Sequence, residues 1–131
     1  MIQDNKKVLL VEDDSAIIDV YSTAFKNGSV ILEVARTGAE AFDKVLESRK
    51  EGGEKIHLVL LDLILPDMNG AEVLKNIKEG ESTKDVPVFI LSNQTSLEGE
   101  QDGSVKPEKF LIKANVSPSQ LVKIVQDYLN K

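Results

Sequence analysis

The chain has 131 residues, 41% of them hydrophobic and 5% aromatic, which is enough for one domain with a mainly aliphatic core. It contains no cysteine, which excludes disulfides and thiolate metal sites. The net charge of −6 disfavours binding to a nucleic-acid backbone. No apolar run has the length of a membrane span or signal peptide. We therefore expect a single cytoplasmic domain over residues 1–131, without membrane insertion or direct contact with nucleic acid.

Strand and helix patterns alternate along the chain. Short, continuous apolar runs, typical of strands covered on both faces, occur at residues 7–11, 30–34, 56–61, 88–91 and 109–112. Apolar side chains at helical spacing occur at residues 17–25, 41–46, 73–77 and 121–129. This alternation predicts an α/β fold, in which helices cover both faces of a parallel sheet. Ligands of such sheets bind beyond the carboxyl ends of the strands.

The segment between the last two predicted strands departs from this pattern. Its only sizeable apolar side chains are Leu97 and Val105, and it contains Gly99, Gly103 and Pro107. A short helix depends on packing for most of its stability, and glycine in a helix interior is unfavourable. The sequence therefore predicts that the fourth helix is degenerate: short, frayed or absent.

Polar residues follow four of the five predicted strands. An acidic run, residues 12–14, follows the first, Asp62 the third, Ser92 the fourth and Lys113 the fifth. Each alone is typical of a turn, a helix cap or the surface, but a parallel sheet brings all of them to one edge. Clustered carboxylates suit a hard cation such as Mg²⁺, and an aspartate can accept a phosphoryl group. An amine and a hydroxyl would then balance and bind the phosphoryl oxygens.

Four segments carry a resemblance to a known family. Residues 8–14, 60–70, 87–92 and 110–113 closely resemble the bacterial response-regulator receiver domain of two-component systems, and residues 62–70 are the most specific of them. The resemblance implies a flavodoxin-like, doubly wound, five-stranded parallel sheet with strand order 2-1-3-4-5. It also implies phosphorylation on an aspartate in the presence of Mg²⁺ or Mn²⁺.

The resemblance assigns roles to the acidic residues. Asp62 corresponds to the phosphoacceptor and is also a metal ligand. Asp13 corresponds to a direct metal ligand, Glu12 to one acting through water, and the main-chain carbonyl of Ile64 to a further ligand. Asp14 could shift the acidic pair by one position, but the first strand ends at residue 11, which favours Glu12 and Asp13.

The resemblance also assigns roles to three residues of the last two strands. Ser92 and Lys113 correspond to the hydroxyl and the amine that bind the phosphoryl group. Ser92 and Phe110 correspond to the switch pair that responds to it, although plain core packing would equally explain Phe110. His57, the only histidine, is a packing or surface residue in this interpretation, because zinc would require several nitrogen or sulfur ligands.

The function expected from the resemblance is that of a switch. A sensor histidine kinase or phosphotransfer protein would supply the phosphoryl group, and a downstream protein would dock on the altered surface. Such a domain catalyses its own phosphorylation and slow dephosphorylation, so whether it is an enzyme is a matter of definition. The alternative is a pseudo-receiver, an interaction module that works without phosphorylation. Two interpretations of the chain stay open: a stand-alone receiver and a domain excised from a longer protein.

Three features differ from the usual family pattern. Asn93 follows Ser92 where a smaller residue is common, which predicts narrower access to Asp62. Ala114 follows Lys113 where proline is common. Because a cis bond before a residue other than proline costs about 2.5–4 kcal/mol, we expect a trans Lys113–Ala114 bond with Lys113 still directed at Asp62. The weak fourth helix predicts that residues 95–108 are mobile and that phosphorylation acts partly by ordering them.

Overall fold

Five strands form one parallel sheet in the computed structural model, which describes residues 5–93 and 105–130. The strand order is β2-β1-β3-β4-β5, so the chain reverses its direction of winding beside β1. The strands are β1 (Lys6–Val11), β2 (Val30–Ala35), β3 (Leu58–Leu61), β4 (Val88–Ser92) and β5 (Lys109–Ile112). This is the flavodoxin-like arrangement expected from the sequence, and that prediction is confirmed.

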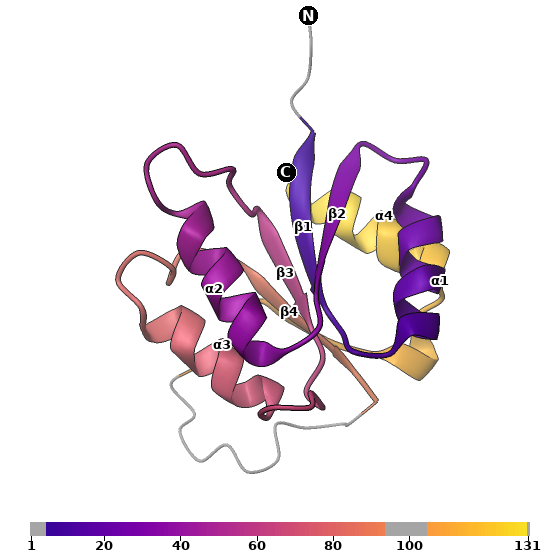
Figure 1. The fold of residues 1–131 in the computed structure, drawn as a ribbon. Helices are drawn as coiled ribbons and strands as arrows, with labels where there is room; N and C mark the ends of the chain where they lie inside the picture. The colour runs from indigo at the N-terminus through magenta and orange to yellow at the C-terminus, as the bar shows by residue number, and fades with distance from the viewer. Residues whose placement is uncertain (1–4, 94–104, 131) are drawn as a thin grey trace, which may run out of the picture.

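Helices cover both faces of the sheet (Figure 1). α1 and α4 lie together on one face, and α2 and α3 lie together on the other. The helices are α1 (Ser15–Phe25), α2 (Gly38–Ser48), α3 (Gly70–Glu79) and α4 (Pro118–Leu129), with a single 3-10 turn, η1 (Lys113–Asn115), after β5. Among the described residues, no helix combines the length and apolarity needed to cross a membrane.

Each helical layer has its own core, because successive strand side chains point to opposite faces. The face covered by α2 and α3 buries Leu9 and Val59, and the face covered by α1 and α4 buries Leu10 and Leu60. β3, with strands on both sides, has no exposed residue. This explains why the central strands of the sequence are continuous apolar runs rather than alternating ones.

The third strand begins at Leu58, not at residue 56 as predicted. Ile56 is apolar and buried, as a strand residue would be, but it is not part of β3. The degenerate helix predicted between β4 and β5, which is not the helix labelled α4, falls mainly on residues 94–104. These residues, and with them most of the segment 95–108 that was predicted to be mobile, lie outside the described residues. The described residues at either end of that segment, Asn93 and 105–108, are not helical.

Candidate functional site

The strand register brings the predicted polar residues to one edge of the sheet. Val11 pairs with Leu61, so Glu12 and Asp62 leave two neighbouring strands side by side. The backbone N–H of Asp62 donates to the Val11 carbonyl at 3.2 Å, which continues the pairing by one residue. On the other side of β3, Ser92 at the end of β4 pairs with Ile112, the last residue of β5, which directly precedes Lys113.

Lys113 joins the two buried carboxylates of this edge. Its Nζ lies 2.7 Å from Glu12 Oε1 and 2.9 Å from Asp62 Oδ2. The exposed fractions of the side chains are 12% for Lys113, 3% for Glu12 and 10% for Asp62, so water screens the three charges only weakly. The expected direction of Lys113 toward Asp62 is therefore confirmed. The remaining Glu12 oxygen accepts a hydrogen bond from the N–H of Asp14 at 3.2 Å.

Burial and ion pairing shift the pKa values of the cluster in opposite directions. Burial raises the pKa of Glu12 above its ordinary value, although the hydrogen bond and the charge of Lys113 oppose the shift. Burial alone would lower the pKa of Lys113, but the hydrogen bonds with Glu12 and Asp62 outweigh it, and the pKa is raised. Burial also raises the pKa of Tyr21 on α1, which the charges of this cluster reach. The cluster is thus a low-dielectric site with more acid than base.

The acidic run after β1 divides into three different environments. Glu12 is buried, Asp13 is exposed, and the Asp14 carboxylate caps α1 by accepting hydrogen bonds from the N–H groups of Ala16 and Ile17. The cap occupies Asp14, which agrees with choosing Glu12 and Asp13 as the acidic pair. The backbone explains the difference, because the N–H of Glu12 still bonds to β2 and holds Glu12 in line with the sheet.

The proposed cation ligands suit Mg²⁺ by their chemistry. Glu12, Asp13, Asp62 and the Ile64 carbonyl are all oxygen donors, and Mg²⁺ in proteins commonly takes one or two carboxylates together with water and phosphate. Two buried carboxylates share a single ammonium, which leaves negative charge for a cation to balance. Among the described residues, no three acidic, histidine or cysteine side chains already converge as a ligand group.

Ser92 and Phe110, the predicted switch pair, occupy different depths. Ser92 is 1% exposed at the end of β4. Phe110 is half-buried on β5 and packs against the core under α2 and α3. The packing of Phe110 agrees with the plain core interpretation, and its role as a switch stays a prediction.

Asn93 and Ala114, the two residues next to the site that differ from the usual family pattern, contact each other. The Lys113–Ala114 peptide bond is trans, as predicted, and both residues belong to the turn η1. The side-chain Oδ1 of Asn93 accepts a hydrogen bond from the N–H of Ala114 at 3.1 Å. A proline at position 114 would have no N–H to donate. Asn93 and Ala114 therefore form a link between the end of β4 and the residue that follows Lys113.

We expect the change Asn93→Ala to lower the free energy of unfolding by about 0.5–1 kcal/mol, the usual net contribution of one hydrogen bond. Urea unfolding measures this change. The variant Asn93→Asp is the matched control, because it keeps an acceptor oxygen at the same place and should lose less. Equal losses in both variants would show that the link contributes nothing through its acceptor.

His57 does not belong to the site. It precedes β3, and its Nδ1 accepts a hydrogen bond from the backbone N–H of Lys7 at 3.1 Å. Burial, together with the charges of Lys6 and Lys55, lowers the pKa of His57, so the neutral ring is favoured. This agrees with its predicted role as a packing or surface residue.

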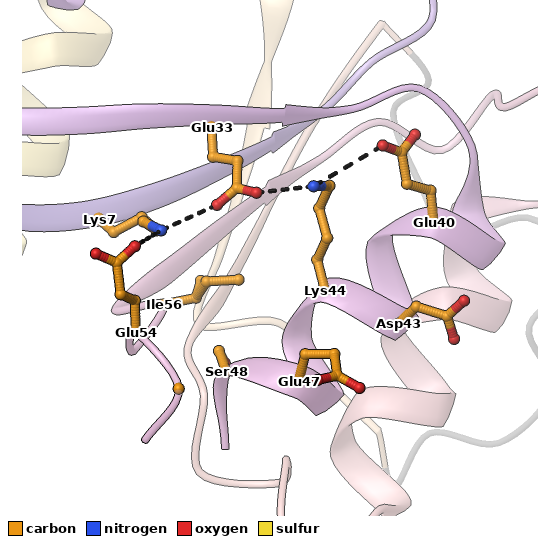
Figure 2. A pocket seen from close by; sticks show the side chains of 10 residues that line it. Lys7, Glu33, Glu40, Asp43, Lys44, Glu47, Ser48, Glu54 and Ile56 are labelled. Atoms are coloured by element: carbon orange, nitrogen blue, oxygen red, sulfur yellow. Dashed lines mark hydrogen bonds and ion pairs between the residues drawn. The ribbon is translucent and has the colours of Figure 1, made fainter. Parts of the chain in front are cut away.

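A hollow beside β2 and α2 is lined by many charged side chains (Figure 2). Among them, Glu33 lies between two amines, Lys7 Nζ at 3.2 Å and Lys44 Nζ at 2.8 Å. Lys7 also pairs with Glu54. The amines are therefore already paired with carboxylates of the same hollow, and none of the predicted site residues lines it.

Comparison with known proteins agrees with the fold and with the family that the sequence resembles. The family model of the response regulator receiver domain matches residues 8–126. The chain therefore belongs to the response regulator receiver domains of two-component systems. It is 38% identical over 86 residues to the transcriptional regulatory protein CpxR homolog of Haemophilus influenzae, an alignment that covers 66% of this chain and 34% of that protein. The chain thus spans about a third of that relative's length.

Two solved structures illustrate the likeness. The phosphorylated cyanobacterial phytochrome response regulator RcpA is 32% identical, with a TM-score of 0.74, and the alignment covers 95% of this chain and 91% of RcpA. The Mn²⁺-bound form of the response regulator Rcp1 is 28% identical, with a TM-score of 0.72, and the alignment covers 93% and 90% of the two chains.

Proposed function

We propose that Asp62 accepts a phosphoryl group from a sensor histidine kinase or phosphotransfer protein, in the presence of Mg²⁺ or Mn²⁺. The observation that carries the proposal is the buried Asp62 carboxylate, which lies beside Glu12 and shares the Lys113 ammonium with it. RcpA, which is similar over most of its length, has been solved in a phosphorylated form, and Rcp1 with Mn²⁺ bound. Those findings concern RcpA and Rcp1, and they support the same chemistry for this chain.

In the proposed reaction an Asp62 oxygen attacks the phosphorus atom of a phosphohistidine. The new O–P bond gives an acyl phosphate, and the P–N bond breaks so that the electron pair returns to the histidine ring of the donor. Lys113 would neutralise charge on the phosphoryl oxygens, and the Ser92 hydroxyl would donate a hydrogen bond to one of them. Mg²⁺, when bound by Glu12, Asp13, Asp62 and the Ile64 carbonyl, supplies further positive charge for the phosphoryl oxygens.

Phosphorylation would change a docking surface for a downstream protein. Ser92 lies at the end of β4 and Phe110 on the neighbouring edge strand β5, so a movement of the first toward the phosphoryl group could reach the second. The proposed phosphoryl donor is a protein of the histidine kinase or phosphotransfer class, and the proposed docking partner is a downstream protein. The proposed location of the domain is the cytoplasm.

Intact mass after incubation with acetyl phosphate and Mg²⁺ tests the proposal. The wild type should gain one phosphoryl group, and Asp62→Asn should gain none, because an amide is a poor nucleophile. Asp43→Asn, which changes an exposed aspartate of α2, is the matched control and should behave as the wild type. A mass gain that persists in Asp62→Asn would contradict the assignment. No gain in the wild type with several donors would favour the phosphorylation-independent alternative.

A further inference from the structure

The loop between β2 and α2 carries no predicted site residue, yet it contacts the two loops that carry the proposed cation ligands. Toward the loop after β1, the Arg36 guanidinium donates from Nη1 to the carbonyl oxygen of Asp13 at 3.3 Å and to Ser15 Oγ at 3.2 Å. Arg36 is therefore hydrogen-bonded to the main chain of a proposed cation ligand. The backbone N–H of Arg36 donates to Glu40 Oε1 at 2.9 Å, which ties the arginine to the first turn of α2.

The same loop also holds the loop after β3. Asp67 accepts one hydrogen bond at each carboxylate oxygen, from the N–H of Gly38 at 2.8 Å and from the N–H of Ala39 at 3.0 Å. The start of α2 and the loop after β3 approach each other closely. A Cβ added at Gly38 would lie only 2.6 Å from Met68 Cγ. Asp67 thus connects the start of α2 to the segment that carries the Ile64 carbonyl.

These contacts form a brace, which we define as residues 36–39 together with the Asp67 carboxylate. Near the site, Lys113 also joins these two loops through its contacts with Glu12 and Asp62. The loop after β3 is itself closed by the bridge between Ile64 and Asn69, which flank Asp67 in the sequence. The brace therefore connects the loop that carries Asp13 with the loop that carries Ile64.

We propose that Arg36 and Asp67 are positioning residues for the divalent cation. They would act through the loops that carry Asp13 and Ile64, without touching the cation or the phosphoryl group. The inference rests on the proposed function, because it requires that the cation bind at this edge of the sheet. Groups that orient metal ligands typically affect affinity by about 10–100-fold.

The sign of the effect at Arg36 separates positioning from charge. Removing a cationic side chain near an acidic site would, by Coulomb's law alone, strengthen the binding of a divalent cation. Loss of positioning would weaken it. Arg36→Ala is therefore expected to raise the Kd for Mn²⁺ by about tenfold, against the electrostatic direction. Asp67→Glu leaves the net charge unchanged and displaces the carboxylate by one methylene, and should also raise the Kd.

The experiment is a titration of the unphosphorylated full chain with Mn²⁺, with the free ion measured by electron paramagnetic resonance. Arg49→Ala is the matched control for Arg36→Ala. Arg49 also donates one side-chain hydrogen bond to a carbonyl, that of Ser82 at 3.0 Å, but at the opposite end of α2. This control should keep the Kd of the wild type. Thermal unfolding without metal checks that all variants are folded and shows how far stability alone has changed.

The outcomes distinguish the two proposals. Weaker binding in Arg36→Ala and Asp67→Glu, with Arg49→Ala unchanged, supports the brace. Equal or tighter binding in Arg36→Ala, while the wild type binds Mn²⁺, overturns the positioning role and leaves the proposed function intact. A wild type that binds no Mn²⁺ overturns both.

Discussion

Replacing Lys113 with methionine should lower the free energy of unfolding at pH 7 by about 3–5 kcal/mol, the usual result of removing one partner from a buried ion pair. The change leaves Glu12 and Asp62 without the ammonium that both contact, at 2.7 and 2.9 Å, in a region that water barely reaches. Phosphoryl acceptance by Asp62 should also be lost, because the proposed charge partner of the phosphoryl group is gone. Urea unfolding and intact mass measure the two effects.

The loss should depend on pH in a definite direction. The folded-state pKa of Glu12 is raised above its ordinary value of 4.5, so its contribution to stability is complete below that pH and is lost as the pH rises through the folded pKa. Without Lys113 the folded pKa of Glu12 should rise further. The deficit of the variant is therefore expected to shrink as the pH is lowered from 7 towards 4.5, because Glu12 takes up a proton.

Alkaline pH gives a second check of the same variant. The pKa of Lys113 is raised above 10.5, so its contribution is complete below that pH and is lost as the pH rises through the folded pKa. The wild type should lose this stability at high pH, and Lys113→Met should not. Lys123→Met is the matched control, because the ion pair of Lys123 with Asp127 is 77% and 68% exposed and should contribute less than about 1 kcal/mol. Equal losses in both variants would contradict the buried-pair explanation.

Most of the fold could be predicted because its central strands are continuous apolar runs. β3 has no exposed residue, and such a strand must be a continuous apolar run, which is visible in the sequence. Its first residue could not be placed, since Ile56 is buried and apolar without being part of the strand. Burial can be predicted from apolar residues in the sequence, but the residue at which strand pairing begins depends on the neighbouring strand.

The site residues were predictable to the extent that they directly follow strands. Glu12, Asp62 and Lys113 lie together as expected, because parallel strands end at the same edge. The different environments of Glu12 and Asp13 were not foreseen, since they follow from the one hydrogen bond that keeps Glu12 in line with β2.

The brace could not be predicted from the sequence at all. Arg36 is 23 residues from Asp13, and Gly38 is 29 residues from Asp67. An arginine or an aspartate in a polar loop is ordinary for a surface, and nothing local marks either as a partner of a distant backbone group. Such contacts follow from how neighbouring loops meet above the sheet, which only the assembled fold defines.

Gly70→Ala should be the most damaging small substitution, with a loss of about 3 kcal/mol or more in the free energy of unfolding. Gly70 begins α3, and its N–H donates at 2.7 Å to the carbonyl of Leu63, the residue after Asp62. A Cβ there would overlap the main-chain carbonyl oxygen of Asp62 and lie 2.8 Å from Leu63 Cα. These are backbone atoms, so relief requires the main chain at Asp62 to move. A displacement of about 1 Å at a reacting group can reduce its rate by about 100-fold.

Gly38→Ala is the matched control for Gly70→Ala. Gly38 also begins a helix, α2, so alanine gives both variants the same gain in helix propensity. A Cβ at Gly38 would meet only side-chain atoms, those of Met68 and Val73 at 2.6–2.8 Å. The flexible Met68 side chain can yield, whereas Val73 is buried and stiff. The loss should therefore be smaller than for Gly70→Ala, about 1–2 kcal/mol. Urea unfolding of both variants measures the difference, and phosphoryl acceptance by Gly70→Ala should fall far more than its folded fraction. Equal stability losses, or full phosphoryl acceptance by folded Gly70→Ala, would show that the Asp62 main chain tolerates the displacement.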